Sequence, residues 1–423
     1  MEYQPRLVDG LLGELLAELP AIAVEGAKGV GKTATAERFA AQVFSLDRDA
    51  AFASVAADPE IIATGEGTTF VDEWQLVPSV WNVVKRAVDR GAPPGRFLLA
   101  GSAAPKADLR LHSGAGRIVS LIMRPLSFPE RQLETPSVSL AALLSGERPA
   151  VGGTTDMGTT DYVGEILRSG FPGVRQASPR GRGLLLDGYL SRIVEQDIPQ
   201  ADGVVRRPAL LREWLTAYAA ATATTASYNS LAVAAYPGEE GVPARGTTAA
   251  YRDLLKRIFV LDPVPAWIPS FSHLKRLAQS PKHHLVDPAL AARLVGVDAA
   301  GLIRGQGSGG QHPDGTFLGA LFESLAVQTV RVLTESTGAS VSHLRDQNNE
   351  REIDLIIQRS DHKVLAIEVK LTTAIRPKDV RSLNWLEREL GERVLDKVLI
   401  CTGDRAFRRP DGVAVVPLAL LGP

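Results

Sequence analysis

The sequence predicts an α/β protein of several domains, and three observations lead to this expectation. Its 423 residues are too many for a single hydrophobic core. Over residues 1–160, short apolar runs alternate with helical patterns, which is typical of a parallel sheet with flanking helices. The middle of the chain has the pattern of nearly continuous helix, and apolar strands return toward the C-terminus.

Two loop-like stretches divide the chain. The first, Val151–Asp161, contains Gly-Gly-Thr-Thr and Gly-Thr-Thr, and the second, Gly301–Thr316, is rich in glycine. Neither fits a regular element. We therefore expect three units: a unit with a parallel sheet at 1–160, a helical unit at 161–300 and an α/β unit at 312–423.

The hydrophobic pattern places individual elements within these units. The strands expected in the first unit are Ala21–Glu25, a segment near Phe44–Leu46, Thr69–Val71, Phe97–Ala100 and Ile118–Leu121. The helices expected in the middle unit are Gly183–Asp197, Pro208–Ala221, Ser230–Ala235 and Thr247–Ile258. The last unit is expected to contain helices near Leu318–Leu333 and Lys378–Leu390, with strands at Val341–Arg345, Glu352–Gln358, Val364–Lys370 and Lys397–Cys401.

Composition excludes several classes of protein. The formal net charge is −1, so binding to nucleic acid would have to use a local basic patch. The single cysteine, Cys401, allows neither a disulfide framework nor a cysteine-based zinc site, which fits a reducing cytoplasm. The start of the chain lacks the pattern of a signal peptide. Trp214–Gly238 carries no charge but is rich in Ala, Thr and Ser, so we expect packed helices there rather than a membrane span.

A glycine-rich segment follows the first expected strand and precedes a helical stretch, Ala34–Gln42. It matches G-x-x-x-x-G-K-[ST] in full, with the residues Gly26, Ala27, Lys28, Gly29, Val30, Gly31, Lys32 and Thr33. Such a loop turns backbone N–H groups around phosphates, and the helix N-terminus adds partial positive charge. Lys32 is expected to reach the β- and γ-phosphates and Thr33 to bind Mg²⁺. The motif predicts binding and hydrolysis of ATP with Mg²⁺; the alternative is a glycine-rich turn that matches by accident.

Two acidic residues end the expected strand Thr69–Val71. Their carboxylates are expected at the carboxyl edge of the sheet, where α/β folds bind ligands. There Asp72 would hold the hydrated Mg²⁺, and Glu73 would orient or deprotonate the attacking water. Taken alone, two such acids are often a solvated strand end, but the complete phosphate loop favours the catalytic interpretation.

Two further polar residues are candidates for the same site. Ser102 follows the strand Phe97–Ala100, where a polar side chain would sense the γ-phosphate; the alternative is that it caps a turn. Arg117 would act as an arginine finger, in cis or from a neighbouring subunit, or it is an ordinary surface arginine.

With these motifs, the chain resembles a large prokaryotic family of AAA-type ATPases that carry a C-terminal domain of unknown function (4143). The resemblance covers almost the whole chain, and Val71 and Trp74 depart from the family's usual residues without moving the two acids. It implies an AAA-type domain, ATP as ligand, and a homo-oligomer formed through that domain. The segments that carry it are Tyr3-x-Pro5-Arg6, the phosphate loop, Val71-Asp72-Glu73-Trp74-Gln75, Leu99-Ala100-Gly101-Ser102, Arg124-Pro125-Leu126-Ser127-Phe128-x-Glu130, Tyr189-Leu190-x-x-Ile193-Val194-x-x-Asp197-Ile198 and Pro281-Lys282-x-x-x-Val286-Asp287.

The middle unit resembles a winged helix. Ser227–Ala235 and Gly246–Ile258 would form its helix-turn-helix, and Phe259–Leu261 would begin a wing strand, as in the family. A basic face on the second helix could contact the phosphates of DNA. The alternative is a solvated face on a module that only packs against protein. The basic residues concerned are Arg245, Arg252, Lys256 and Arg257.

The last unit carries a second chemical pattern, in which Glu323 lies on a helix, Asp354 in a strand, and Glu368 and Lys370 on one face of the next strand. Paired acids can bind Mg²⁺, and a nearby lysine can activate water or stabilise a developing phosphorane. The order resembles the restriction-endonuclease-like, PD-(D/E)xK superfamily. The resemblance implies Asp354, Glu368 and Lys370 as catalytic residues and Glu323, Asp354 and Glu368 as metal ligands. Activity stays open, because this superfamily often keeps its shape after losing turnover.

Together these patterns predict a cytoplasmic Mg²⁺-ATPase that couples its nucleotide state to a nuclease-like region acting on DNA or RNA. The contrasting hypothesis is a nucleotide-dependent switch or scaffold without cleavage, and a third is a DNA-binding regulator that holds ATP as a structural ligand. A basic groove beside Asp354 and Glu368 would favour the first hypothesis. A groove blocked by the chain's own residues, or a neutral one, would favour the second.

Overall fold

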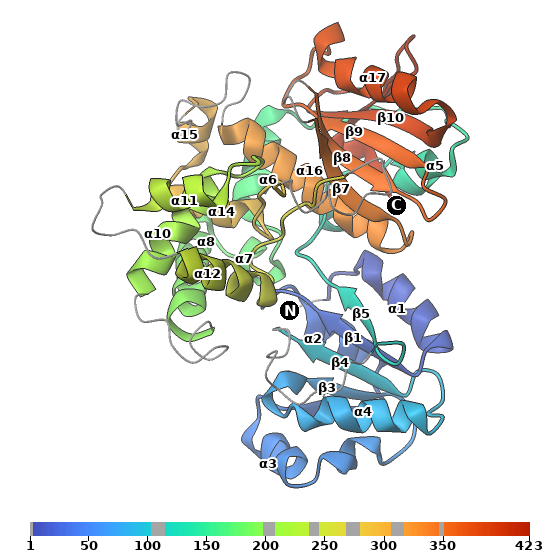
Figure 1. Ribbon diagram of the computed structural model, residues 1–423, viewed down its shortest axis with the longest axis vertical. Coiled ribbons are helices and arrows are strands. Elements are labelled where there is room, and N and C mark those ends of the chain that lie inside the picture. The colour runs from blue at the N-terminus through green and yellow to red at the C-terminus, as the bar shows by residue number, and fades with distance from the viewer. Residues whose placement is uncertain are drawn as a thin grey trace.

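The computed structural model describes residues 3–102, 115–197, 208–236, 245–267, 280–305, 317–346 and 351–423. Figure 1 shows a sheet with its helices formed by the N-terminal part of the chain, a cluster of helices beside it, and a second sheet formed by the C-terminal part. The long helix α16 (Phe317–Glu335) runs between the helical cluster and the second sheet.

The N-terminal sheet contains five parallel strands in the order β2-β3-β4-β1-β5. The three inner strands are almost wholly buried because helices cover both faces, and the parallel sheet expected from the sequence is confirmed. Their carboxyl ends meet at one edge of the sheet. The strands are β1 (Ala21–Glu25), β2 (Gln42–Ser45), β3 (Thr69–Asp72), β4 (Phe97–Gly101) and β5 (Val119–Ile122), and the helices are α1 (Leu7–Glu18), α2 (Lys32–Ala36), α3 (Asp49–Ala57) and α4 (Ser79–Asp89).

The helix expected over Ala34–Gln42 is wrong in length. Helix α2 ends at Ala36, a 3-10 turn covers Glu37–Phe39, and β2 already begins at Gln42. The N–H groups of Ala41 and Gln42 both donate to the Thr68 carbonyl, at 2.9 and 3.1 Å, which brings the chain into the sheet beside β3. Pairing with a neighbouring strand therefore overrides the local helical propensity.

The middle of the chain is helical, as expected. The Phe259–Leu261 segment forms no continuous wing strand; it and the residues after it make isolated bridges, Leu261 with Leu285 and Val264 with Lys282. The winged helix therefore stays a prediction. The helices are α6 (Thr159–Arg168), α7 (Pro172–Arg175), α8 (Pro179–Arg192) with a π-helical end (Ile193–Asp197), α10 (Pro208–Ala220), α11 (Tyr228–Ala235), α12 (Arg245–Arg257), α14 (Pro288–Val295) and α15 (Ala299–Ile303). The expectations for Ile198 and for residues 306–316 fall outside the described residues.

The C-terminal sheet is mixed and has six strands in the order β11-β12-β10-β9-β8-β7. β7, β8 and β9 pair antiparallel, whereas β9, β10 and β12 pair parallel. Helix α17 (Arg381–Leu390) packs against this sheet. The strands are β7 (Ser340–Arg345), β8 (Glu352–Gln358), β9 (Val364–Val369), β10 (Val394–Cys401), β11 (Phe407–Arg408) and β12 (Ala414–Pro417).

The segment that follows the N-terminal sheet lies against the C-terminal unit. β6 (Val138–Ser139) pairs in parallel with β13 (Leu421–Gly422), and Thr154 forms a bridge with Arg405. Helix α5 (Leu140–Ser145) packs against both β6 and β10. The division of the chain at residue 160 stays a prediction, but the two sheets are tied together by these contacts.

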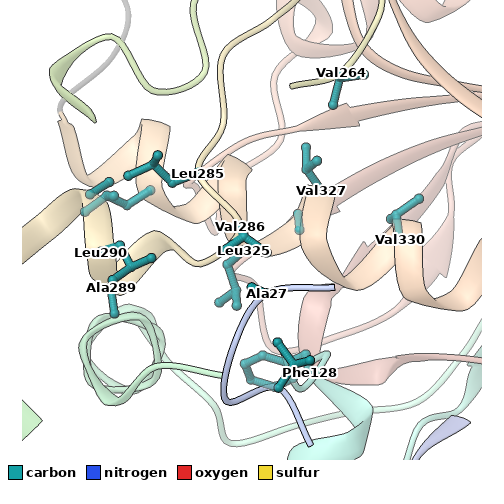
Figure 2. Packing of buried hydrophobic residues seen from close by; sticks show 14 of the residues in the cluster. Ala27, Phe128, Val264, Leu285, Val286, Ala289, Leu290, Leu325, Val327 and Val330 are labelled. Carbon is teal, nitrogen blue, oxygen red and sulfur yellow. The ribbon is translucent and has the colours of Figure 1, made fainter. Parts of the chain in front are cut away.

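One apolar cluster runs through all three regions, and α16 lies inside it. Figure 2 shows Ala27 of the phosphate loop, Phe128, Val286 and Leu325 gathered in one part of that cluster. Of the described helices, α16 is the one long and apolar enough to cross a membrane, and 72% of its apolar window is buried inside the protein. Its apolar length is therefore explained by its place in the core.

Candidate functional site

The phosphate loop connects β1 to α2 at the carboxyl edge of the N-terminal sheet. Gly26, Gly29 and Gly31 have φ angles of 152°, 78° and 106°. Such angles suit glycine, and at Gly26 an added Cβ would lie 2.2 Å from the Met123 carbonyl oxygen. The path of the loop therefore depends on its glycines.

Lys32 lies folded against the loop. Its Nζ donates to the carbonyls of Gly26 and Ala27, at 2.8 and 2.9 Å, and its side chain is almost wholly buried. Burial lowers the pKa of Lys32 to about 8, although Glu73 and Asp72 nearby favour its charged form. The negative oxygens of a triphosphate would stabilise that charged form far better than two carbonyls do.

Thr33 and Asp72 lie together, as a shared Mg²⁺ site requires. The Thr33 hydroxyl donates to Asp72 Oδ2 at 2.7 Å, and the other carboxylate oxygen accepts from the Glu73 N–H at 3.1 Å. Burial raises the pKa of Asp72 despite these hydrogen bonds. A hydroxyl and a carboxylate oxygen are the ligands that Mg²⁺ prefers, so the residues fit this ion, whose charge would neutralise the buried carboxylate.

Glu73 is held by two polar neighbours. Its backbone is left-handed, with φ of 51°. The Ser102 hydroxyl donates to Glu73 Oε2 at 2.9 Å, and the Gln75 amide donates to the same oxygen. Ser102 thus lies between the strand ends, as the sequence predicts, but its hydrogen bond is to Glu73.

Gln75 also belongs to the site, although the sequence pattern assigns it no role. Its amide also lies 3.4 Å from the Ser102 hydroxyl, so Gln75, Ser102 and Glu73 form one group. A Cβ at Gly101 would lie 2.9 Å from Gln75 Oε1 and from Trp74 Nε1. The glycine before Ser102 therefore leaves the space in which this group packs.

Arg6 is a second residue whose role could not be predicted from the sequence. Its guanidinium donates to the Val30 carbonyl of the phosphate loop at 2.7 Å, to the Arg124 carbonyl at 2.7 Å and to Glu130 Oε1 at 3.0 Å. The other Glu130 oxygen accepts from the N–H and the hydroxyl of Ser127. The stretch around Arg6 and the stretch over residues 124–130 thus contact each other and support the phosphate loop at Val30.

Arg117 lies far from these groups. It precedes β5, at the amino edge of the sheet, and pairs at 2.9 Å with Asp89 at the end of α4. Because the phosphate loop is at the opposite edge of a parallel sheet, the cis arginine-finger hypothesis is wrong. A role toward a neighbouring subunit stays a prediction.

The acidic constellation of the C-terminal unit comes together in space. Asp354 of β8 accepts from the Val369 N–H at 2.8 Å, and Lys370 Nζ pairs with Glu368 Oε1 at 2.7 Å. The second Glu368 oxygen is buried and has no hydrogen-bond partner among the described residues. Glu323 reaches the same group from α16, because it shares a partner with Asp354.

That shared partner is Lys282, to which the sequence pattern assigns no role. Its Nζ lies 2.9 Å from Glu323 Oε1, 2.8 Å from Asp354 Oδ1 and 2.7 Å from Glu352 Oε1. The three donors of the ammonium are thus matched by three carboxylates. The chain's own lysine thus occupies the space between Asp354 and Glu323.

The pKa values in this cluster reflect burial and pairing. Burial opposes ionisation of Asp354, but the Lys282 ammonium beside it lowers its pKa to about 2. Burial and the nearby Asp354 charge raise the pKa of both Glu323 and Glu368 to about 8. The three carboxylates raise the pKa of Lys282 well above its usual value despite its burial. The cluster therefore keeps its lysine charged.

No metal centre is formed by side chains alone in the described parts of the chain. There, no group of three or more His, Cys, Asp or Glu side chains is arranged to hold a metal ion. Lys282 takes the position between Glu323 and Asp354 that a metal would need. The proposed metal ligands Glu323, Asp354 and Glu368, and the catalytic roles of Asp354, Glu368 and Lys370, stay predictions.

The basic face of α12 is partly engaged within the protein. Arg252 stacks over the Tyr228 ring at 4.8 Å and pairs with Asp253 at 2.9 Å. Lys256 is exposed, although partial desolvation by its neighbours and the nearby Arg252 charge lower its pKa. These contacts leave less charge available for a phosphate backbone than the sequence alone indicates.

Family models match three consecutive parts of the chain. An AAA domain matches residues 18–132, which contain the phosphate loop and the two acids of β3. The chain carries an AAA domain. A domain of unknown function (DUF8612) matches residues 159–301, and another (DUF4143) matches residues 318–421. The expected AAA-type domain and the expected C-terminal domain of unknown function are confirmed.

Relatives have been identified over most of the length. Uncharacterized proteins of Mycobacterium tuberculosis and Mycobacterium bovis are each 24% identical over 412 residues, which is 96% of this chain and 82% of the relative. The similarity thus extends through the AAA domain and both domains of unknown function.

Solved structures give weaker likenesses. The Walker-type ATPase PABY2304 of Pyrococcus abyssi is 14% identical with a TM-score of 0.40, covering 69% of this chain and 96% of that chain. A RuvB point mutant of Thermotoga maritima is 17% identical with a TM-score of 0.26, covering 61% of this chain and 89% of that chain. The AAA assignment rests on the matched family model and on the geometry of the phosphate loop.

Proposed function

We propose that this protein is a Mg²⁺-dependent ATPase that acts as a nucleotide-driven switch on its own C-terminal unit. The single observation that carries the ATPase proposal is the hydrogen bond from Thr33 of the phosphate loop to Asp72 of β3. It joins the two oxygens between which Mg²⁺ of a bound nucleotide would be held. Glu73, fixed by Ser102 and Gln75, would orient or deprotonate the attacking water.

The switch proposal is supported by contacts that lead away from the phosphate loop. Arg6 links the Val30 carbonyl of the loop to the Arg124 backbone. The Arg124 side chain pairs at 2.8 Å with Asp262 of the helical unit and at 3.3 Å with Glu335 of α16. A shift of the loop on nucleotide binding would therefore reach both other units through side chains already in contact.

A second contact leads in the same direction. The Phe171 ring lies 3.9 Å from the position that a Cβ at Gly29 would occupy. The N–H of Gly170, the preceding residue, donates to the Asp287 carboxylate at 2.6 Å. Asp287 ends the short segment, residues 281–287, that carries Lys282 into the acidic cluster. The loop and the acidic cluster are thus separated by a few packed residues.

The ATPase proposal is tested by turnover measurements with Mg²⁺ and with EDTA, in the presence and absence of DNA and RNA. Lys32→Ala and Asp72→Asn should each lower kcat/KM by about a hundredfold or more, because the first removes the positive charge that stabilises the transferring phosphoryl group and the second weakens the binding of Mg²⁺. Lys363→Ala, an exposed lysine on the turn between β8 and β9, serves as a control that keeps activity. Turnover unaffected by Lys32→Ala would refute the proposal.

A nuclease is the second candidate function, favoured by the pairing of Glu368 with Lys370 next to Asp354. This proposal requires that Lys282 moves away from Asp354, because the two side chains are paired in the structure. The test is Mg²⁺-dependent cleavage of DNA and RNA with ATP present, comparing the native chain with Asp354→Ala. An absence of cleavage in both would favour the switch without nuclease activity.

A further inference from the structure

The acidic cluster in the C-terminal unit has the make-up of a cation site. Three carboxylate oxygens, from Glu323, Glu352 and Asp354, lie within 2.7–2.9 Å of one nitrogen. Hard divalent cations prefer such oxygen ligands, several at a time. The carboxylate oxygens that bind the ammonium here would also bind a metal ion with twice its charge at a similar position.

A separate observation shows that the cluster has spare binding capacity. Glu368 is almost wholly buried, and its Oε2 atom has no hydrogen-bond partner among the described residues, although Oε1 pairs with Lys370. Burial and the Asp354 charge raise the pKa of Glu368, whereas the charges of Lys370 and Lys282 act in the opposite direction. A buried carboxylate oxygen without a partner is costly, and a cation in this cluster would satisfy it.

The cation that is present comes from another part of the chain. Lys282 lies on the 281–287 segment, whose backbone is fixed by the bridge to Val264 and by the Asp287 contacts with Ser169 and Gly170. Glu323 belongs to α16, and Glu352 and Asp354 belong to β8. The lysine is therefore tethered to the helical unit, whereas its acidic partners belong to the C-terminal unit.

We propose that Lys282 is a tethered cation that closes a latent divalent-cation site formed by Glu323, Asp354 and Glu368, with Glu352 at its edge. While the 281–287 segment stays in place, the ammonium excludes Mg²⁺ and keeps the C-terminal unit inactive. Withdrawal of the segment leaves the carboxylates free to bind the metal. The claim that nucleotide binding moves the segment rests on the proposed nucleotide-driven switch. The claim that Lys282 closes the site does not depend on it.

The test is Mn²⁺ binding without nucleotide, measured by electron paramagnetic resonance of the free ion on the full-length chain. Lys282→Met keeps the side-chain length and removes the charge. We expect it to bind one Mn²⁺ at least tenfold more tightly than the native chain, and we expect Asp354→Asn in the Lys282→Met background to abolish the gain. Because the assay contains no ATP, its outcome is independent of whether the AAA domain hydrolyses nucleotide.

A matched control is available in the same unit. Lys397 is as deeply buried as Lys282, and its Nζ bonds Glu387, the Asn384 side chain and the Asp411 carbonyl. It thus has one carboxylate partner instead of three, so Lys397→Met should bring no gain in Mn²⁺ binding. A gain of equal size in both variants would overturn the proposal, because it would reflect general loosening.

The thermal midpoint provides a second measurement, because Lys282→Met leaves three buried or half-buried carboxylates without their cation. Its midpoint should rise in Mn²⁺ relative to EDTA, whereas that of the native chain should not. A native chain that binds Mn²⁺ through Asp354 as tightly as Lys282→Met would overturn the proposal. So would a variant that stays unfolded in both solutions, because the metal would then not replace the amine.

Discussion

At the scale of single residues, the nucleotide site depends on the orientation of the Glu73 carboxylate. Its carboxylate could point to solvent, but Ser102 and Gln75 both donate to one of its oxygens. The left-handed backbone at Glu73 turns the chain away from β3 at this point. The residue that we expect to handle the attacking water is therefore held by side chains from the adjoining turn and from the end of β4.

This arrangement predicts different effects for two substitutions. Glu73→Gln should lower kcat by about 10²–10⁴-fold while ATP binding persists, because it removes the proton acceptor. Ser102→Ala removes one hydrogen bond to Glu73 and should lower kcat by about tenfold with KM nearly unchanged. Steady-state kinetics of both variants provide the measurement. If Ser102→Ala raised KM instead, Ser102 would contact the γ-phosphate directly.

At the scale of elements, a short N-terminal stretch supports the phosphate loop. Arg6 supports the loop by donating a hydrogen bond to the Val30 carbonyl. The Arg6 guanidinium and the Glu130 carboxylate are both almost wholly buried and satisfy each other at 3.0 Å. Removing one partner alone would leave the other charge buried and unpaired.

The Arg6–Glu130 pair can be measured by a double-mutant cycle. Arg6→Ala should reduce the free energy of unfolding by about 3–5 kcal/mol and weaken ATP binding, whereas Arg6→Ala with Glu130→Gln should cost less than the two single changes added. Urea unfolding and nucleotide titration provide the data. Arg48→Ala, an exposed arginine before α3, is the control and should change stability by less than about 0.5 kcal/mol. Additive losses would show that the pair is not coupled.

The 281–287 segment also sets a pH dependence. Burial lowers the pKa of His283 to about 4, although its bond to the Ala226 carbonyl favours the charged form. The folded state thus binds fewer protons than the unfolded state between about pH 4 and 6.5. The stability contributed by neutral His283 is therefore complete above about pH 6.5 and is lost as the pH falls toward 4.

His283→Asn should remove this contribution. Between about pH 6.5 and 4 the dependence of the unfolding free energy on pH should become shallower, by up to about 1.4 kcal/mol per pH unit. Urea unfolding at a series of pH values measures the slope. His362→Asn, an exposed histidine in the turn between β8 and β9, is the matched control and should leave the slope unchanged. Equal slopes for native chain and His283→Asn would contradict the prediction.

At the scale of the whole molecule, the three regions share one core. α16 contacts α1 of the first unit, α6 and α14 of the second, and β7, β8 and β9 of the third. The Phe128 N–H donates to the Thr329 hydroxyl on α16, and Gln328 on the same helix donates to the Val286 carbonyl. The long helix α16 therefore contacts all three units and offers one route by which a nucleotide-driven movement could spread.

A cavity created by a truncated side chain on α16 should accordingly destabilise the fold of all three units. Leu325→Ala, at a fully buried position, should reduce the free energy of unfolding by about 2–5 kcal/mol. It should also lower the thermal midpoint of the ATP-binding unit. Nucleotide-dependent fluorescence during heating measures this midpoint. Leu184→Ala on α8 removes the same atoms at a site that is 64% exposed and should have little effect. An unchanged midpoint for nucleotide binding would show that the units unfold separately.

The sequence alone was sufficient for local features. The phosphate loop, the strands that flank it and the acids of β3 could be predicted because glycine positions, hydrophobic alternation and turn residues act within a few neighbours. Strand alternation predicted that Glu368 and Lys370 share one face, and the resemblance to the PD-(D/E)xK order added Glu323 and Asp354 to the same constellation.

Only the tertiary structure decided which distant residues meet. Lys282 is 72 residues from Asp354, and Arg6 is 124 residues from Glu130, so no periodic pattern could relate them. The short α2 and the position of Arg117 likewise depend on strand pairing and on the two edges of the sheet. These contacts form because a buried charge requires a partner, and the partner is whichever residue the packed core brings within reach.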